Sequence, residues 1–153
     1  MSVDREELLT RLRRVPDRLD RLVEDHPRDL LCQAGAGGAW GAVEILSFLR
    51  DWDAVVGDRL SLMLTEDDPE FEDEDPDLWS IERDYHTEEP SNVVKEFRSG
   101  REELVARLEK LNDVAWSRTG HLPDGTRITI EDLVQQLTRS DKQQLASLRE
   151  MLD

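Results

Sequence analysis

Apolar side chains recur at helical spacing in four stretches of the chain, at about residues 4–24, 42–64, 91–116 and 130–152. Within each stretch they return every three or four residues, which places them on one face of a helix. Pro16 lies inside the first stretch and is expected to kink that helix or divide it in two, because proline lacks an N–H and crowds the preceding turn. The pattern predicts an all-α fold.

Residues at the ends of these stretches predict how the helices begin and connect. Ser91 is expected to be the N-cap of the third helix, and Thr129 with Asp132 three residues later resembles a capping box that opens the last one. The links after the first and third helices are short, whereas the middle link is long. This arrangement predicts a four-helix bundle whose second and fourth helices can lie face to face.

The long middle link begins with an acidic segment, residues 66–77, which contains two prolines. Such a segment is expected to cross the bundle as a solvated chain without regular structure, with Phe71 and Trp79 packing it against the helices. It lacks the central glycine and ligand spacing of an EF-hand loop, so calcium binding is disfavoured. The glycine-rich stretch QAGAGGAWG has no Gly-Lys-Ser/Thr after it and is expected to be a flexible connection.

Length and charge narrow the range of functions. The 153 residues predict a single domain, 1–153, with one core. A net charge of -16 repels phosphates and anionic lipid, which disfavours nucleic acid and membrane surfaces as partners. A lone Cys32 excludes an intramolecular disulfide and is more typical of a small buried residue than of a nucleophile. Without a signal peptide or spanning segment, a cytoplasmic protein is expected.

Two polar residues interrupt the apolar face of the last helix. Ser140 and Gln144 fall on the stripe formed by leucines at positions 133, 137 and 148. One interpretation is that both residues lie at the edge of the stripe, bonded to water or to a neighbouring helix. The other interpretation is that this part of the stripe faces a polar pocket between helices.

The stretches WGAVEILSFLRDWD and AWSRTGHLPDGTRITIEDLVQQLTRSDKQQL resemble the DinB/YfiT-like family of metalloenzymes, and the resemblance runs nearly from end to end. In that family a Trp opens the second helix, a histidine follows about two turns later, and the last helix carries two histidines at i and i+4. Three imidazoles from facing helices leave a coordination position open for water or substrate. The resemblance therefore implies a four-helix bundle with a metal site between helices.

The three ligand positions implied by the resemblance are occupied here by Phe48, Ser140 and Gln144. Phenylalanine cannot coordinate a metal, and a hydroxyl or an amide is a poor ligand for zinc or nickel. The resemblance favours the second interpretation of the polar residues, a vestigial pocket. Its neighbours are expected to be these four residues: Glu44, Asp51, Trp52 and Asp141. A replacement carboxylate site is the disfavoured alternative.

Two classes of function follow from this resemblance. The first is a metal-free relative with no cofactor, catalytically degenerate, which is retained to bind a small molecule or another protein. The alternative is an active enzyme with a rearranged zinc or nickel site, acting as a metal-dependent hydrolase or as a transferase or isomerase that uses a low-molecular-weight thiol. Family members commonly dimerise through helix faces, so a homodimer is a further expectation.

Overall fold

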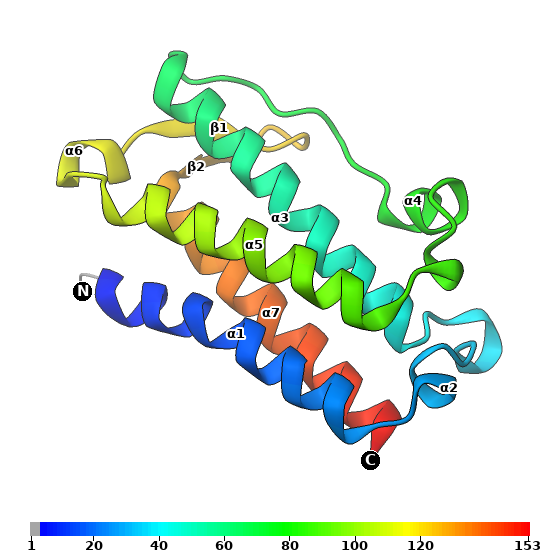
Figure 1. The fold of residues 1–153 in the computed structure, drawn as a ribbon. Helices are drawn as coiled ribbons and strands as arrows, with labels where there is room; N and C mark the ends of the chain where they lie inside the picture. Colours follow the sequence, from blue (N-terminus) through cyan, green and yellow to red (C-terminus); the bar gives the residue numbers. More distant parts are fainter. Residues whose placement is uncertain (1–3) are drawn as a thin grey trace.

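The computed structural model describes residues 4–153 and is dominated by four long helices (Figure 1). They are α1 (Arg5–Asp25), α3 (Ala42–Thr65), α5 (Pro90–Glu109) and α7 (Ile130–Leu152). Their bounds lie close to the four stretches predicted from apolar periodicity, except that the third helix ends earlier than expected. The expected all-α four-helix bundle is confirmed.

The order of the helices around the bundle differs from their order in the sequence. Helix α1 packs against α5 and α7, and α3 packs against the same two helices, so α1 and α3 lie diagonally opposite each other. Helices α3 and α5 run in the same direction (Figure 1). Since the 24 residues of α3 span about 36 Å at 1.5 Å per residue, the chain must return along most of that length before α5 begins. This return explains the long middle link.

The link contains more regular structure than its composition predicts. After an extended segment, the short helix α4 (Pro76–Glu82) and the 3₁₀ turn η2 (Tyr85–Thr87) precede α5. Asp75 caps α4, because its carboxylate accepts a hydrogen bond from the N–H of Leu78. The expectation of a segment without regular structure over residues 66–77 therefore holds for its extended part but is wrong for residues 76 and 77, which open α4.

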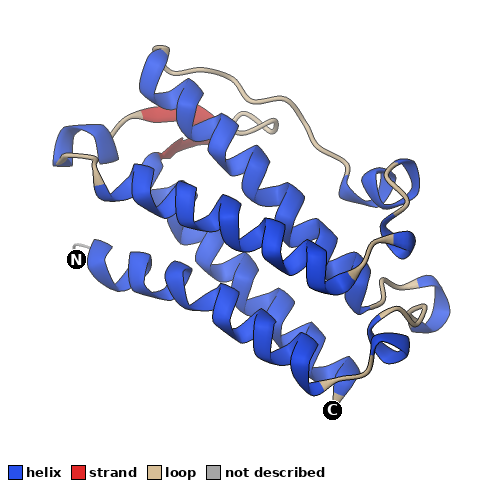
Figure 2. Cartoon of the chain, viewed as in Figure 1, coloured by secondary structure: helices blue, strands red, loops and turns tan. Residues whose placement is uncertain are grey.

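The remaining links hold short elements (Figure 2). Helix α2 (Arg28–Leu31) and the 3₁₀ turn η1 (Ala36–Gly38) lie between α1 and α3. Between α5 and α7 lie α6 (Asp113–Trp116) and a two-stranded antiparallel hairpin, β1 (Thr119–His121) and β2 (Arg127–Thr129). The apolar periodicity of the sequence did not predict these strands.

The two predicted caps have different outcomes. The Thr129 hydroxyl accepts from the N–H of Asp132 and the Asp132 carboxylate accepts from the N–H of Thr129, which confirms the capping box. Ser91 is not an N-cap, because α5 already begins at Pro90, with Glu89 before it. Proline suits the first turn of a helix, where its missing N–H would have no intrahelical partner.

Pro16 does not divide the first helix, because α1 continues through it from Arg5 to Asp25. The missing N–H of Pro16 would have bonded to the carbonyl of Leu12, four residues earlier. In the structure that carbonyl accepts a hydrogen bond of 3.2 Å from Nη1 of Arg101 on α5. A side chain from a neighbouring helix therefore replaces the bond that proline removes.

The link between α3 and α5, residues 66–89, is called the crossing below, and its side chains and backbone hold it against the bundle. Phe71 and Trp79 are buried, as predicted. The N–H of Phe71 donates to the carbonyl of His121, and the N–H of His121 donates to that of Pro69, so the extended segment lies beside β1. Gly120 permits this approach, because a Cβ there would lie 2.6 Å from the Phe71 ring.

Among residues 4–153, no helix combines the length and apolar character needed to span a membrane.

Candidate functional site

The Phe48 side chain, at the first of the three implied ligand positions, is part of an aromatic stack on α3. Its ring centroid lies 5.4 Å from that of Trp40 and 5.8 Å from that of Trp52. Trp52 in turn lies 6.3 Å from Trp79 of α4, and the Phe48 side chain is only 8% exposed. An apolar ring therefore fills the place where the resemblance implies an imidazole.

The other two implied positions lie on α7 and are half-buried. Gln144 lines an open hollow of about 370 Å³ between the start of α3 and the end of α7, together with Trp40 and Ile45. Trp40 lines this hollow and also lies beside the Phe48 ring, so its indole connects the hollow to the aromatic stack. Ser140 is one turn earlier on α7 and does not line this hollow. Convergence of all three side chains stays a prediction.

A second hollow, of about 620 Å³, adjoins the first one. It lies between the glycine-rich connection after α2 and the end of α7, and the two hollows share Ala39, Trp40, Ser147 and Met151. Asp77 lines the first hollow and Glu150 lines the second, whereas neither is lined by lysine or arginine. The region presents an indole, a carboxamide and carboxylates to solvent.

Glu44, an expected pocket neighbour, has two structural contacts instead. One of its oxygens accepts a 3.1 Å hydrogen bond from the N–H of Gly41 at the start of α3. The other accepts a 2.8 Å bond from the Ser80 hydroxyl of α4. Glu44 therefore stabilises the first turn of α3 and holds the crossing against it.

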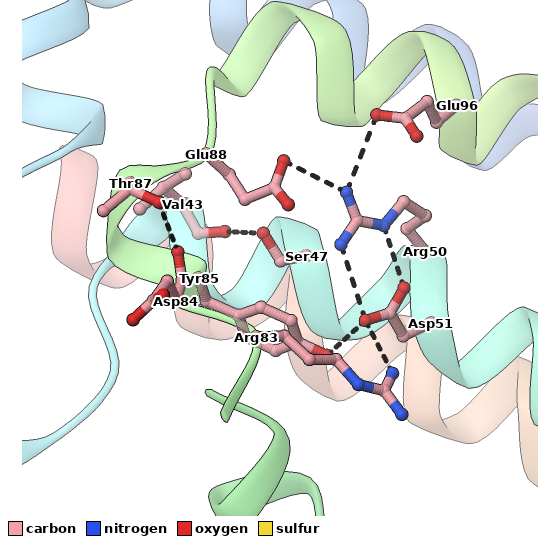
Figure 3. Close-up of polar contacts among 10 residues, drawn as sticks. All are labelled: Val43, Ser47, Arg50, Asp51, Arg83, Asp84, Tyr85, Thr87, Glu88 and Glu96. Atoms are coloured by element: carbon pink, nitrogen blue, oxygen red, sulfur yellow. Dashed lines mark hydrogen bonds and ion pairs between the residues drawn. The ribbon is translucent and has the colours of Figure 1, made fainter. Parts of the chain in front are cut away.

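Asp51, the second expected neighbour, lies at the centre of the polar network in Figure 3. Its carboxylate accepts hydrogen bonds from Arg50 (2.9 Å), Arg83 (3.0 Å) and the Tyr85 hydroxyl (2.5 Å). Burial alone would raise the pKa of Asp51, but these three donors outweigh it and hold the pKa below its ordinary value. Asp51 is therefore an ionised anchor for η2 and not a free base facing a pocket.

Asp141, the third expected neighbour, is bound to a buried arginine that the sequence reasoning did not identify. Arg101 of α5 is 0% exposed and forms paired hydrogen bonds to two carboxylates, 2.8 and 2.9 Å to Asp53 of α3 and 2.8 and 3.0 Å to Asp141 of α7. With the bond to Leu12 of α1, all five guanidinium N–H groups are used. One side chain thus joins all four long helices.

These three charged residues lie between two of the apolar clusters of the core. Leu12, Val56, Leu104 and Leu137 belong to one hydrophobic cluster, and Val15, Leu49, Phe97 and Leu145 belong to the other. On each helix the polar atoms bound to Arg101 therefore lie between the two clusters. We call Arg101, Asp53 and Asp141 the polar layer. Burial raises the pKa of both carboxyl groups, an effect that the shared Arg101 cation opposes but does not cancel.

Comparison with known proteins agrees with this topology. The sequence matches the DinB superfamily over residues 11–147. The chain belongs to the DinB superfamily. YfiT from Bacillus subtilis, described as a probable metal-dependent hydrolase with an unusual four-helix bundle topology, is 25% identical with a TM-score of 0.90. That match covers 98% of this chain and 88% of YfiT.

A second solved structure of similar fold is a mycothiol-dependent maleylpyruvate isomerase, with a TM-score of 0.76 and 14% identity. The match covers 95% of this chain but 61% of the isomerase, so the isomerase has a part that this DinB-superfamily chain does not match. At this identity the likeness concerns the fold alone. A search of curated proteins gives no significant match.

The residues at the implied ligand positions do not suit the metal that the YfiT description suggests. Phe48 offers no donor atom, and the nearby carboxylates of Glu44, Asp51 and Asp141 are already bound to other groups. No group of three or more His, Cys, Asp or Glu side chains within residues 4–153 is arranged to hold a metal ion. The three histidines lie in separate parts of this DinB-superfamily bundle: His26 follows α1, His86 is in η2 and His121 is in β1.

Proposed function

We propose that this protein is a metal-independent member of the DinB superfamily that binds a small molecule and does not perform metal-dependent catalysis. The observation that carries the proposal is the Phe48 ring, packed between two tryptophans where a ligand of the metal is implied. Replacing an imidazole by a phenyl ring removes a donor and adds apolar area to the stack, so the substitution stabilises the bundle while it removes the metal site.

The hollows beside Trp40 are the proposed binding region. Their combined lining includes Asp77 and Glu150 but no lysine or arginine, which favours a neutral or cationic ligand over an anionic one. The indole of Trp40 offers a face for stacking or for a cation, and the Gln144 amide offers one donor group and one acceptor. A small amine or amide with an apolar part fits this chemistry.

Metal content tests the proposal that the protein is metal-independent. Protein purified without a His-tag, loaded with zinc or nickel and dialysed, should contain far less than one metal ion per chain by mass spectrometry. Replacing Phe48, Ser140 and Gln144 together by histidine should create a site, provided that these positions converge. Stoichiometric metal in the parent protein would contradict the proposal.

The triple-histidine variant needs a matched comparison, because it changes stability as well as metal binding. Without metal it should be less stable than the parent by about 1–3 kcal/mol, since a buried ring is exchanged for a more polar one. Added zinc should raise its melting temperature by mass action, relative to the same variant with chelator. A folded variant that binds neither zinc nor nickel would show that the three positions do not converge.

Tryptophan fluorescence tests the proposed binding of a small molecule beside Trp40. We expect small aromatic amines to change the emission of the protein, and matched carboxylates to have a weaker effect. Gln144→Ala should weaken this binding, whereas Gln143→Ala, at the exposed neighbouring position of α7 outside both hollows, should not. Equal effects of both substitutions, or preferential binding of carboxylates, would contradict the proposed region.

The competing function is a metal-dependent hydrolase, or a thiol-dependent transferase or isomerase, with ligands from elsewhere in the bundle. The likeness to YfiT over 98% of this chain is the observation that favours it. The same metal measurement distinguishes the two functions. Metal that is retained by the parent and abolished by substituting a carboxylate would favour the enzyme.

A further inference from the structure

A hollow between α1 and α7 is lined by positively charged side chains, although the whole molecule is negatively charged. It has a volume of about 420 Å³. Five basic side chains line it, Arg11, Arg14 and Arg18 from α1 and Lys142 and Arg149 from α7. We call these five residues and the hollow between them the basic groove. One quarter of the 20 lysines and arginines of a chain with net charge -16 therefore meet in one place.

Most of these cations lack an acidic partner, unlike several other arginines of the bundle. Within residues 4–153, Arg11 pairs with Glu7, but the other four form no ion pair within 4 Å. By contrast, arginines at positions 5, 13 and 98 pair with carboxylates on neighbouring helices. Arg14 and Arg18 are four residues apart on one helix face, a spacing at which like charges destabilise the helix. Helix stability alone does not account for this arrangement.

The floor of the basic groove provides no counter-ion. Val15 and Leu145 are buried there, and the Asp141 carboxylate is occupied by both of its bonds to Arg101. The acidic crossing runs along α3, diagonally across the bundle from α1 (Figure 1). At physiological ionic strength charges separated by more than about 8 Å are largely screened, so the acidic crossing contributes little to the electrostatic field in the groove.

We propose that the basic groove binds a small anion of the oligophosphate class, independently of the region beside Trp40. Arg11 and Arg18 are seven residues apart, or about 10 Å along the helix axis. Two or three linked phosphates match cations spread over that length better than a single phosphate or carboxylate does. The planar guanidinium group pairs well with phosphate oxygens, and binding would relieve the repulsion between the unpaired cations.

Calorimetric titration with sodium tripolyphosphate tests the proposal. The parent should bind one equivalent at 50 mM salt, and more weakly at 200 mM. The variant R14Q/R18Q should bind at least about tenfold more weakly, because it removes two of the central cations. It should remain folded by circular dichroism, since both side chains are exposed and unpaired.

The matched control is R21Q/R139Q, which makes the same change in net charge on the two helices that form the groove. Arg21 of α1 and Arg139 of α7 are exposed and lie outside the groove lining. Binding should change less than about twofold in this control. Equal weakening in both double variants would overturn the proposal in favour of a diffuse charge effect.

Further titrations identify the chemical class. Adenosine triphosphate should compete with tripolyphosphate. Tighter binding of the nucleotide would indicate that its base packs against the apolar floor of the groove. Citrate, a small polyanion without phosphate groups, should bind more weakly than tripolyphosphate. Equal binding of citrate, absence of tripolyphosphate binding at 50 mM salt, or binding only of long polyanions such as duplex DNA would overturn the proposal.

Discussion

Replacing Arg101 by methionine tests the role of the polar layer most directly. The substitution keeps a long apolar stem but removes five N–H donors, four of which bond to the carboxylates of Asp53 and Asp141. Both carboxylates would then remain buried without a cation. Removing one partner of a buried ion pair costs about 3–5 kcal/mol, a large part of the 5–15 kcal/mol by which a domain of this size is stable.

Urea denaturation measures this loss, and its pH dependence identifies the cause. Burial raises the pKa of Asp53 and Asp141 already in the parent, and loss of the cation should raise both further. A carboxyl group whose pKa is higher in the folded protein takes up protons on folding, so stability falls as pH rises toward that pKa. The deficit of R101M should therefore be larger at pH 8 than at pH 5.

A second variant separates charge from packing. In R101M/D53V/D141V all three buried charges are removed together, so no buried carboxylate is left without a counter-ion. Apolar replacement of a complete buried ion network is often neutral or stabilising, and we expect this variant to recover most of the loss. The reasoning would be refuted if R101M lost less than about 1 kcal/mol, or if the triple variant were as unstable as the single one.

Two further predictions concern the contact between the crossing and the hairpin. Gly120→Ala should destabilise the protein by about 1–3 kcal/mol in the same urea assay, because its Cβ would press on the Phe71 ring, and unchanged stability would contradict this packing. The hydrogen bond to Asp68 raises the pKa of His121, so a histidine NMR titration should give a value above 6.5 that falls in Asp68→Asn. This contact contributes fully below about pH 6.5 and is lost as pH rises through the folded pKa of His121; an unshifted pKa would contradict it.

The four long helices could be predicted because each has an unbroken apolar face. The start of the second helix at Ala42 and the capping box at Thr129 agree with the structure. The third helix ends early, at Glu109, and Asn112 then caps the separate helix α6. That asparagine is a start signal inside an otherwise periodic stretch, and apolar periodicity alone gave it no weight.

The crossing was harder to predict, because its order comes from contacts with other parts of the chain. Phe71 and Trp79 were the visible signals, and both are buried. The donors that fix the rest, such as Tyr85 to Asp51 and Ser80 to Glu44, join positions more than 30 residues apart. No local spacing predicts such pairs.

The sequence contains a signal for the polar layer that helical periodicity alone does not reveal. Arg101 lies four residues after Phe97 and three before Leu104, in the middle of an apolar stripe. Asp53 lies between Leu49 and Val56 in the same way. An arginine and an aspartate at buried positions of two helices indicate a buried ion pair, because each would otherwise be too costly to bury. Only the fold shows that Asp141 completes the layer.

The polar residues on the inner face of α7 lie in two different environments. Asp141, fully used by Arg101, holds α7 in the bundle, whereas Ser140 and Gln144 are half-buried. A metal bound between α3 and α7 would stabilise the same helix pair by favouring the folded state. Because Arg101 already joins those helices through Asp53 and Asp141, the bundle does not depend on a metal for that contact. Other side chains can then occupy the ligand positions that the resemblance implies without loss of the fold, and the Phe48 stack agrees with the metal-independent role proposed above.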